Sequence, residues 1–161
     1  MKPMRSILAR FAAPLCACAI VLAAVVSASS AIAHDPELVQ VQAKGSFDET
    51  ATGIREGLEA HKLMVPRQYH FHDMLRMAGI ESEHMMTFET FHPRFGKVVY
   101  ANDRSAFVEL PLRIHLRETD NGVVIWYRRP SSIFGPYDGL AELGAELDTL
   151  FADVIAQVSD E

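Results

Sequence analysis

Histidine and methionine side chains gather in one short stretch of the sequence. All five methionines beyond residue 33 lie between Met64 and Met86, and four of the seven histidines lie between residues 70 and 92. Imidazole and thioether groups together suit copper, above all Cu(I), and His/Met pairs also serve as axial haem ligands. The stretch therefore predicts a copper or haem site, with these candidate ligands: His70, His72, His84, Met86 and His92.

His70 and His72 are the favoured pair in this group. On a strand, residues two apart project from the same face, and His84 and Met86 would do likewise on the next strand. A purely structural role stays open, because methionines often fill cores and Met74 and Met77 have the helical spacing of an inward-packing face. The sequence contains no C-x-x-C-H haem attachment motif and no defined metal-binding spacing.

A second cluster is basic and lies on two predicted strands that pair as a hairpin. One strand alternates Arg113, His115 and Arg117 with apolar residues, and its partner ends with Arg128 and Arg129. Such a row could hold a carboxylate, a sulfate or a haem propionate. The alternative, which we favour, is the solvated face of an amphipathic strand with acidic neighbours as counterions, here Glu118 and Asp120.

Catalytic motifs are missing from the sequence. It contains no G-x-S-x-G, H-E-x-x-H, G-x-x-x-x-G-K-[ST] or G-x-G-x-x-G. We therefore predict no catalytic residue, and a small hydrolase or isomerase ranks as the third function class.

The N-terminal residues predict export. Lys2, Arg5 and Arg10 precede an apolar run from residue 11 to 26, and the segment ends with the small residues Ala31-Ile32-Ala33. These are the parts of a signal peptide over residues 1–33, cleaved after Ala33. A membrane anchor is disfavoured because the run is short, and Cys18 stands too early for a lipid-attachment signal. The processed chain is expected to be periplasmic or secreted, with no stable membrane span.

Cleavage would leave residues 34–161 as one domain, with 12 basic and 21 acidic residues and a formal charge of −9. That charge disfavours a nucleic-acid partner or an anionic membrane surface. Both cysteines would leave with the signal peptide, so neither a disulfide nor a thiolate is expected. His34 would become the N-terminus, where its amine and imidazole could chelate copper together.

Hydrophobic spacing predicts an α+β two-layer sandwich, with a mostly antiparallel sheet and helices packed on one face. Ser46 and Glu49 form a capping box at the start of a helix, and Asp120-Asn121-Gly122 favours a hairpin because Asn and Gly tolerate positive φ. Strands are expected over residues 38–43, 65–71, 85–91, 112–117 and 123–127, and helices over residues 46–63, 72–78, 95–101 and 140–158.

Two segments resemble the domain of unknown function 302 family. One is Leu110-Pro111-Leu112-Arg113, answered by the run from Gly122 to Tyr127 and then Pro130. The other is Phe91-His92-Pro93 followed by Gly96, which is similar to the family's Phe-Gly-Asn-Pro-x-x-Gly segment, with Phe91 and His92 in place of the usual Gly and Asn. The resemblance spans residues 38–158. It implies a small α+β fold, often a dimer, and no settled activity, so no catalytic residue is carried over.

We therefore expect an exported binding or accessory domain whose ligand is copper or haem, held by the His/Met cluster. The alternative is a cofactor-free protein-interaction or assembly module that acts through a sheet edge or a homodimer face. Metal analysis of the processed protein would separate these two classes.

Overall fold

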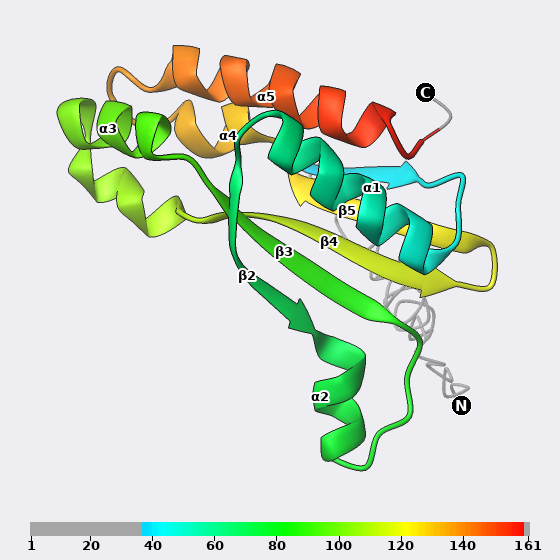
Figure 1. The fold of residues 1–161 in the computed structure, drawn as a ribbon. Helices are drawn as coiled ribbons and strands as arrows, with labels where there is room; N and C mark the ends of the chain where they lie inside the picture. The colour runs from blue at the N-terminus through cyan, green and yellow to red at the C-terminus, as the bar shows by residue number, and fades with distance from the viewer. Residues whose placement is uncertain (1–36, 160–161) are drawn as a thin grey trace, which may run out of the picture. The chain divides into compact units, whose positions relative to one another are not determined.

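The alternating sequence of the chain's middle builds one antiparallel sheet of five strands in the computed structural model, which describes residues 37–159 (Figure 1). The order across the sheet is β1-β5-β4-β3-β2, so β1 and β2 form its two edges. The strands are β1 (Leu38–Gln42), β2 (Met64–His70), β3 (Met85–Phe91), β4 (Leu112–Thr119) and β5 (Gly122–Arg128). The pairing of β2 with β3 shifts register between Met64 and Arg67.

Two long helices, α1 (Phe47–Ala60) and α5 (Ala141–Ala156), lie over one face of the sheet (Figure 1). Helices α3 (Pro93–Asn102) and α4 (Pro130–Phe134) and the 3-10 helix η1 (Arg104–Glu109) gather toward one end, while α2 (Phe71–Met77) extends from the far end of β2. The predicted α+β sandwich, with helices on one face of an antiparallel sheet, is confirmed. No helix among the described residues is long and apolar enough to cross a membrane.

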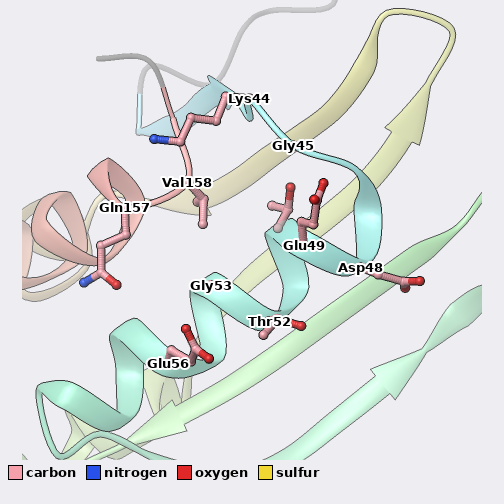
Figure 2. Close-up of a pocket in the computed structure, with 10 residues that line it drawn as sticks. Lys44, Gly45, Asp48, Glu49, Thr52, Gly53, Glu56, Gln157 and Val158 are labelled. Carbon is pink, nitrogen blue, oxygen red and sulfur yellow. The ribbon is translucent and has the colours of Figure 1, made fainter.

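The predicted capping box starts α1. The Ser46 hydroxyl accepts from the Glu49 amide at 3.4 Å, and the Glu49 carboxylate accepts from the Ser46 amide at 2.9 Å. These bonds satisfy amides at the helix start that have no partner within the helix. The hydrogen bonds from Ser46 also lower the pKa of the Glu49 carboxyl. Figure 2 shows Glu49 in this first turn. Its carboxylate is engaged by the hydrogen bonds from Ser46.

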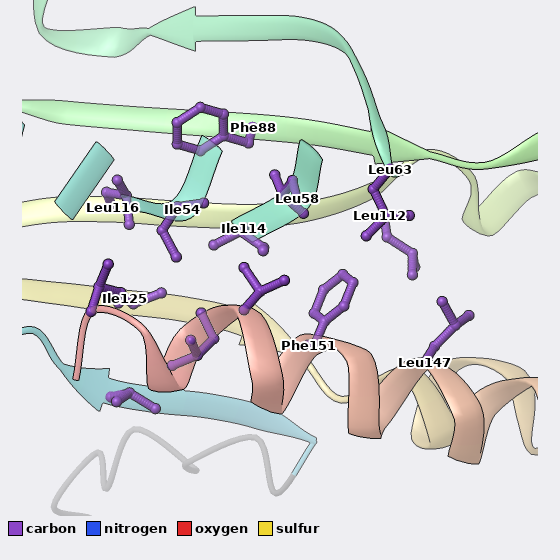
Figure 3. Close-up of a cluster of buried hydrophobic side chains, with 14 of the residues drawn as sticks. Ile54, Leu58, Leu63, Phe88, Leu112, Ile114, Leu116, Ile125, Leu147 and Phe151 are labelled. Carbon is purple, nitrogen blue, oxygen red and sulfur yellow. The ribbon is translucent and has the colours of Figure 1, made fainter. Parts of the chain in front are cut away.

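The core fills the space between the sheet and the two long helices. Leu112, Ile114 and Leu116 of β4 are 5%, 0% and 0% exposed, as their alternation with polar residues predicts. They meet Leu58 of α1 and Phe151 of α5, which are also buried (Figure 3). Arg113 points to the opposite face of the sheet, away from α1 and α5 (Figure 1).

The hairpin between β4 and β5 turns at Asp120 and Asn121, as predicted, and Thr119 pairs with Gly122. Positive φ occurs at Gly122, where it is 101°, and not at Asn121. The Thr119 hydroxyl completes the turn by accepting from the Asn121 amide at 3.2 Å and donating to the Gly122 carbonyl at 2.8 Å. Gly122 is therefore the residue that supplies the positive φ of this turn.

Two elements were not predicted, several boundaries differ by one to three residues, and one of these boundaries affects the candidate site. Neither η1 nor α4 was predicted, because both are short and begin beside loop-forming residues. Strand β2 ends at His70, and Phe71 already belongs to α2. His70 and His72 therefore sit on different elements, and a shared strand face cannot be what brings them together.

Candidate metal site and the open face of the sheet

The junction of β2 and α2 gathers three groups that can bind a metal ion. His70 ends the strand, and His72 and Asp73 lie in the first turn of the helix. One ligand atom from each of the three residues lies within 4.8 Å of the other two. His70 is also the N-cap residue of α2, but its ring makes no capping hydrogen bond to that helix. The sharp turn from strand to helix creates this convergence.

His72 is oriented by the backbone of the neighbouring strand. Its Nδ1 lies 3.0 Å from the carbonyl oxygen of Met85 and 3.2 Å from the Met85 amide. Its Nε2 faces the other way, 3.7 Å from Oδ2 of Asp73. In one tautomer the Met85 amide donates to Nδ1; in the other, Nδ1 donates to the Met85 carbonyl and the Nε2 lone pair points to the cluster. Metal-binding histidines commonly have such a partner on the second nitrogen.

Asp73 is held in a similar way. Its Oδ1 accepts from the Arg76 guanidinium at 2.6 Å, one helical turn further on. Oδ2 is the oxygen that faces His72. Asp73 was not among the predicted ligands. The signal that could have found it is the position of a carboxylate directly after His72 at a predicted helix start.

His84 lies beside this group. Its ring centroid is 4.9 Å from that of His72, in an edge-to-face arrangement, and Phe47 packs against both imidazoles. The Nδ1 of His84 is bonded to Glu118 at 2.8 Å. The α2–β3 connection thus brings together three predicted candidates: His70, His72 and His84.

The other two predicted ligands lie elsewhere. Met86 is 6% exposed in the core, where its sulfur accepts from the Gln68 amide nitrogen at 2.7 Å. His92 lies at the opposite end of β3 and caps α3 by accepting from the Arg94 amide at 3.0 Å. The converging donors at the junction are thus nitrogen and oxygen atoms of His70, His72 and Asp73. His34 lies outside the described residues.

The methionines of α2 do not pack inward. Met74 is 50% exposed and Met77 is 89% exposed. A core role for these two residues was one of the open alternatives, and their exposure contradicts it.

The basic row occupies the open face of the sheet, as its alternation predicts. Its counterions differ from the expected Glu118 and Asp120: Arg113 lies 3.5 Å from Glu89, and Arg117 lies 3.4 Å from Glu83. Arg128, from β5, lies 3.7 Å from Glu37. Every one of these contacts is longer than a normal charge-assisted hydrogen bond.

His115 is the most enclosed member of this row. Its ring lies parallel to that of Trp126 on β5, and its Nδ1 is 2.8 Å from the Thr87 hydroxyl on β3. Burial of the ring, followed by the charge of Arg117, lowers the pKa of His115 below its ordinary value of 6.5. A neutral imidazole therefore sits at the centre of a basic surface at neutral pH.

Two hollows are candidates for a small-molecule site outside the histidine group. One, of about 610 Å³, runs along α1 beside Gln157 and Val158, and its acids include the capping residue Glu49 (Figure 2). The other, of about 470 Å³, lies on the open sheet face over His115 and Trp126. We regard the second as the better candidate for a small molecule, because aromatic and apolar side chains line it together with two guanidinium groups.

Comparisons with known proteins give a family and a fold. A family model described as "Domain of unknown function DUF302" matches residues 39–158. The crystal structure of an uncharacterized conserved DUF302 protein from Bacillus stearothermophilus is similar, with a TM-score of 0.69 and 19% sequence identity. The match covers 76% of this chain and 98% of that one. No protein with a curated description matches the chain significantly.

Proposed function

The chain belongs to the DUF302 family, and from that premise we propose that it is an exported accessory domain that binds a divalent transition-metal ion. The observation that carries the proposal is the convergence of His70, His72 and Asp73, with ligand atoms within 4.8 Å of one another. Two imidazoles and one carboxylate form a recognised donor set for first-row metals.

The donor types favour Cu(II) or Zn(II) over Cu(I) and haem. Imidazole and carboxylate suit borderline divalent ions, and among these Cu(II) binds a given nitrogen and oxygen site most strongly. Met86, the methionine among the predicted ligands, is buried, and its sulfur accepts from Gln68. Copper therefore remains a proposed ligand, but as Cu(II) instead of the Cu(I) that the sequence pattern favoured.

Neighbouring groups support the same assignment by orienting the ligands. The Met85 carbonyl can accept the Nδ1 proton of His72, and Arg76 holds one oxygen of Asp73. Such partners hold the direction of a ligand before the metal arrives, which lowers the cost of ordering the site.

The export half of the proposal rests on the first 33 residues, whose basic start, apolar run and Ala31-Ile32-Ala33 ending are those of a signal peptide. Export would place the domain in an oxidising compartment. The +2 state of copper is the stable one under such conditions, in agreement with the nitrogen and oxygen donors.

Calorimetric titration of the processed protein with Cu(II) and with Zn(II) tests the metal site. We expect one equivalent to bind, and binding to weaken at least tenfold in His70→Gln and in His72→Gln. His61→Gln is the matched control, because this residue lies at the C-terminal end of α1. His34→Gln separates an N-terminal copper site from the proposed one.

Electron paramagnetic resonance of the Cu(II) form should show nitrogen couplings that the two ligand variants lose. Equal binding by His72→Gln and the unmodified protein would contradict the proposal. Binding lost only in His34→Gln would move the metal to the N-terminus. A protein that binds neither ion would favour the cofactor-free interaction module.

A further inference from the structure

The hollow on the open face of the sheet is lined by residues other than those of the proposed metal site. Its volume, about 470 Å³, lies within the range of small-molecule pockets, roughly 300–1,000 Å³. Its floor belongs to β3, β4 and β5, and its walls include Val108 of η1 and Ile133 of α4. Elements far apart in the sequence thus enclose one side of a sheet that is otherwise open.

The floor is flat, partly aromatic and rigid. The rings of His115 and Trp126 have centroids 5.9 Å apart and planes that differ by 14°. Thr87 fixes the imidazole through its Nδ1, which leaves Nε2 as the nitrogen that can meet a ligand. A flat π surface with one polar edge suits an apolar group that carries a hydrogen-bonding head.

Positive charge stands beside this floor. Arg113 is 66% exposed, and its contact with Glu89 joins Nε to the carboxylate at 3.5 Å. That distance is longer than the roughly 2.7–2.9 Å of a strong charge-assisted hydrogen bond. Arg128 lines the hollow as a second guanidinium. The one acid of the lining, Glu109, accepts from the Tyr137 hydroxyl at 2.8 Å.

We propose that this hollow binds a small organic carboxylate with an apolar body. The carboxylate pairs with the guanidinium of Arg113, which offers two parallel N–H donors to one anion. The apolar body lies on the Trp126–His115 floor and against Val108 and Ile133. A bare inorganic anion would leave those apolar walls unused, and an uncharged apolar molecule would gain no charge pairing with the exposed guanidinium of Arg113.

The test uses hexanoate as the probe, with hexanamide and sulfate as its uncharged and purely ionic counterparts. Trp126 is the one tryptophan of the sequence, so intrinsic fluorescence reports on this floor alone. Titrations contain a chelator, which keeps metal binding out of the measurement. Calorimetry with the same probes detects binding that does not alter the fluorescence.

We expect saturable binding of hexanoate and at least tenfold weaker binding of hexanamide and of sulfate. Arg113→Gln should weaken hexanoate binding at least tenfold. Arg113→Lys should retain only part of the affinity for hexanoate, because an ammonium lacks the two parallel donors of a guanidinium. Arg67→Gln is the matched control: Arg67 is on the same sheet face in β2, opposite Glu89, but does not line the hollow.

Three results would overturn the proposal. The first is that neither method detects saturable hexanoate binding. The second is that Arg113→Gln binds hexanoate as well as the unmodified protein does. The third is that sulfate or hexanamide matches hexanoate, which would leave a simple anion site or a simple apolar cleft.

Discussion

The imidazole of His115 lies parallel to the indole of Trp126 on the neighbouring strand, with ring centroids 5.9 Å apart. The two residues are directly paired in the β4–β5 register, so the sheet itself sets their separation. Arg117 adds its guanidinium over the same indole, 5.3 Å from the ring centroid. The fluorescence of Trp126 should therefore depend on the protonation state of His115 and on the position of Arg117.

The first prediction concerns pH. Because burial and Arg117 lower the pKa of His115, the native ring should take up its proton only below pH 6.5. A protonated imidazole quenches a neighbouring indole, so tryptophan fluorescence should fall with a midpoint below 6.5. Arg117→Gln should raise that midpoint, and His115→Gln should abolish the step. A midpoint at or above 6.5 would contradict the assignment.

The same shift has a consequence for stability. Between the two pKa values the unfolded chain binds more protons at His115 than the native chain does, so the free energy of unfolding falls as the pH falls. This loss begins near pH 6.5 and ends below the lowered native pKa. Chemical denaturation of the unmodified protein and of His115→Gln, at pH 7.5 and at pH 5, should show a smaller decrease for the variant.

The second prediction concerns the core face of β4. Ile114 is 0% exposed, so Ile114→Asp should unfold the domain, because an unpaired buried carboxylate costs several kcal/mol. Ile114→Val should cost only about 1 kcal/mol. Arg113→Asp, one residue away on the open face, should stay folded. Thermal melts followed by circular dichroism would measure all three, and a near-normal melting temperature for Ile114→Asp would show the face to be misassigned.

The third prediction concerns Gly144, where we expect alanine to be less stable than glycine although alanine is the better helix former. A Cβ on Gly144 of α5 would lie 2.7 Å from the Cα of Ser131 and 3.2 Å from the Pro130 carbonyl oxygen. Both neighbours are backbone atoms, so Gly144→Ala should destabilise by about 1–3 kcal/mol, although alanine favours helices. At the exposed neighbour, Ala145→Gly should cost about 1 kcal/mol. Urea unfolding of the two variants compares them, and a stabilised Gly144→Ala would contradict the close packing of α4 and α5.

The fourth prediction concerns Arg76 as a positioning residue. It holds Oδ1 of Asp73 at 2.6 Å, so Arg76→Gln should weaken Cu(II) binding about tenfold or more. Its 63% exposed side chain makes a large change in the melting temperature of the metal-free protein unexpected. Calorimetry and a thermal melt together separate the two effects. Unchanged affinity would remove Arg76 from the site without deciding the role of His70 and His72.

The fifth prediction concerns processing. Mass spectrometry of the protein recovered from the periplasm or the medium should find His34 as the first residue, since Ala31-Ile32-Ala33 is the expected cleavage pattern. Ala33→Pro should block cleavage and retain the precursor at the membrane. A full-length product of the unmodified chain, embedded in the membrane, would end the export proposal.

Local signals predicted most of the fold. The alternation of Leu112, Ile114 and Leu116 placed β4 and its buried face, and Ser46 with Glu49 placed the start of α1, because each pattern has a short-range physical cause. Helix α4 was missed because its five residues are too few to display a helical period.

The candidate sites were harder to predict because they depend on contacts across elements. Composition singled out the histidines, but it could not separate His92, which caps α3, from His72, which is oriented by the Met85 backbone. The Gln68 contact of Met86 likewise has no local signal. The apolar walls over His115 come from η1 and α4, the two elements that the sequence did not reveal.

The register shift in β2 bears on how the protein behaves beside copies of itself. Val65 and Pro66 together oppose the single residue Thr90, so this outer strand bulges, and Pro66 has no amide hydrogen to donate. Bulges and prolines on outer strands interrupt the row of backbone groups on which a foreign strand would align. The edge of the sheet at β2 is therefore protected against strand addition and fibre growth.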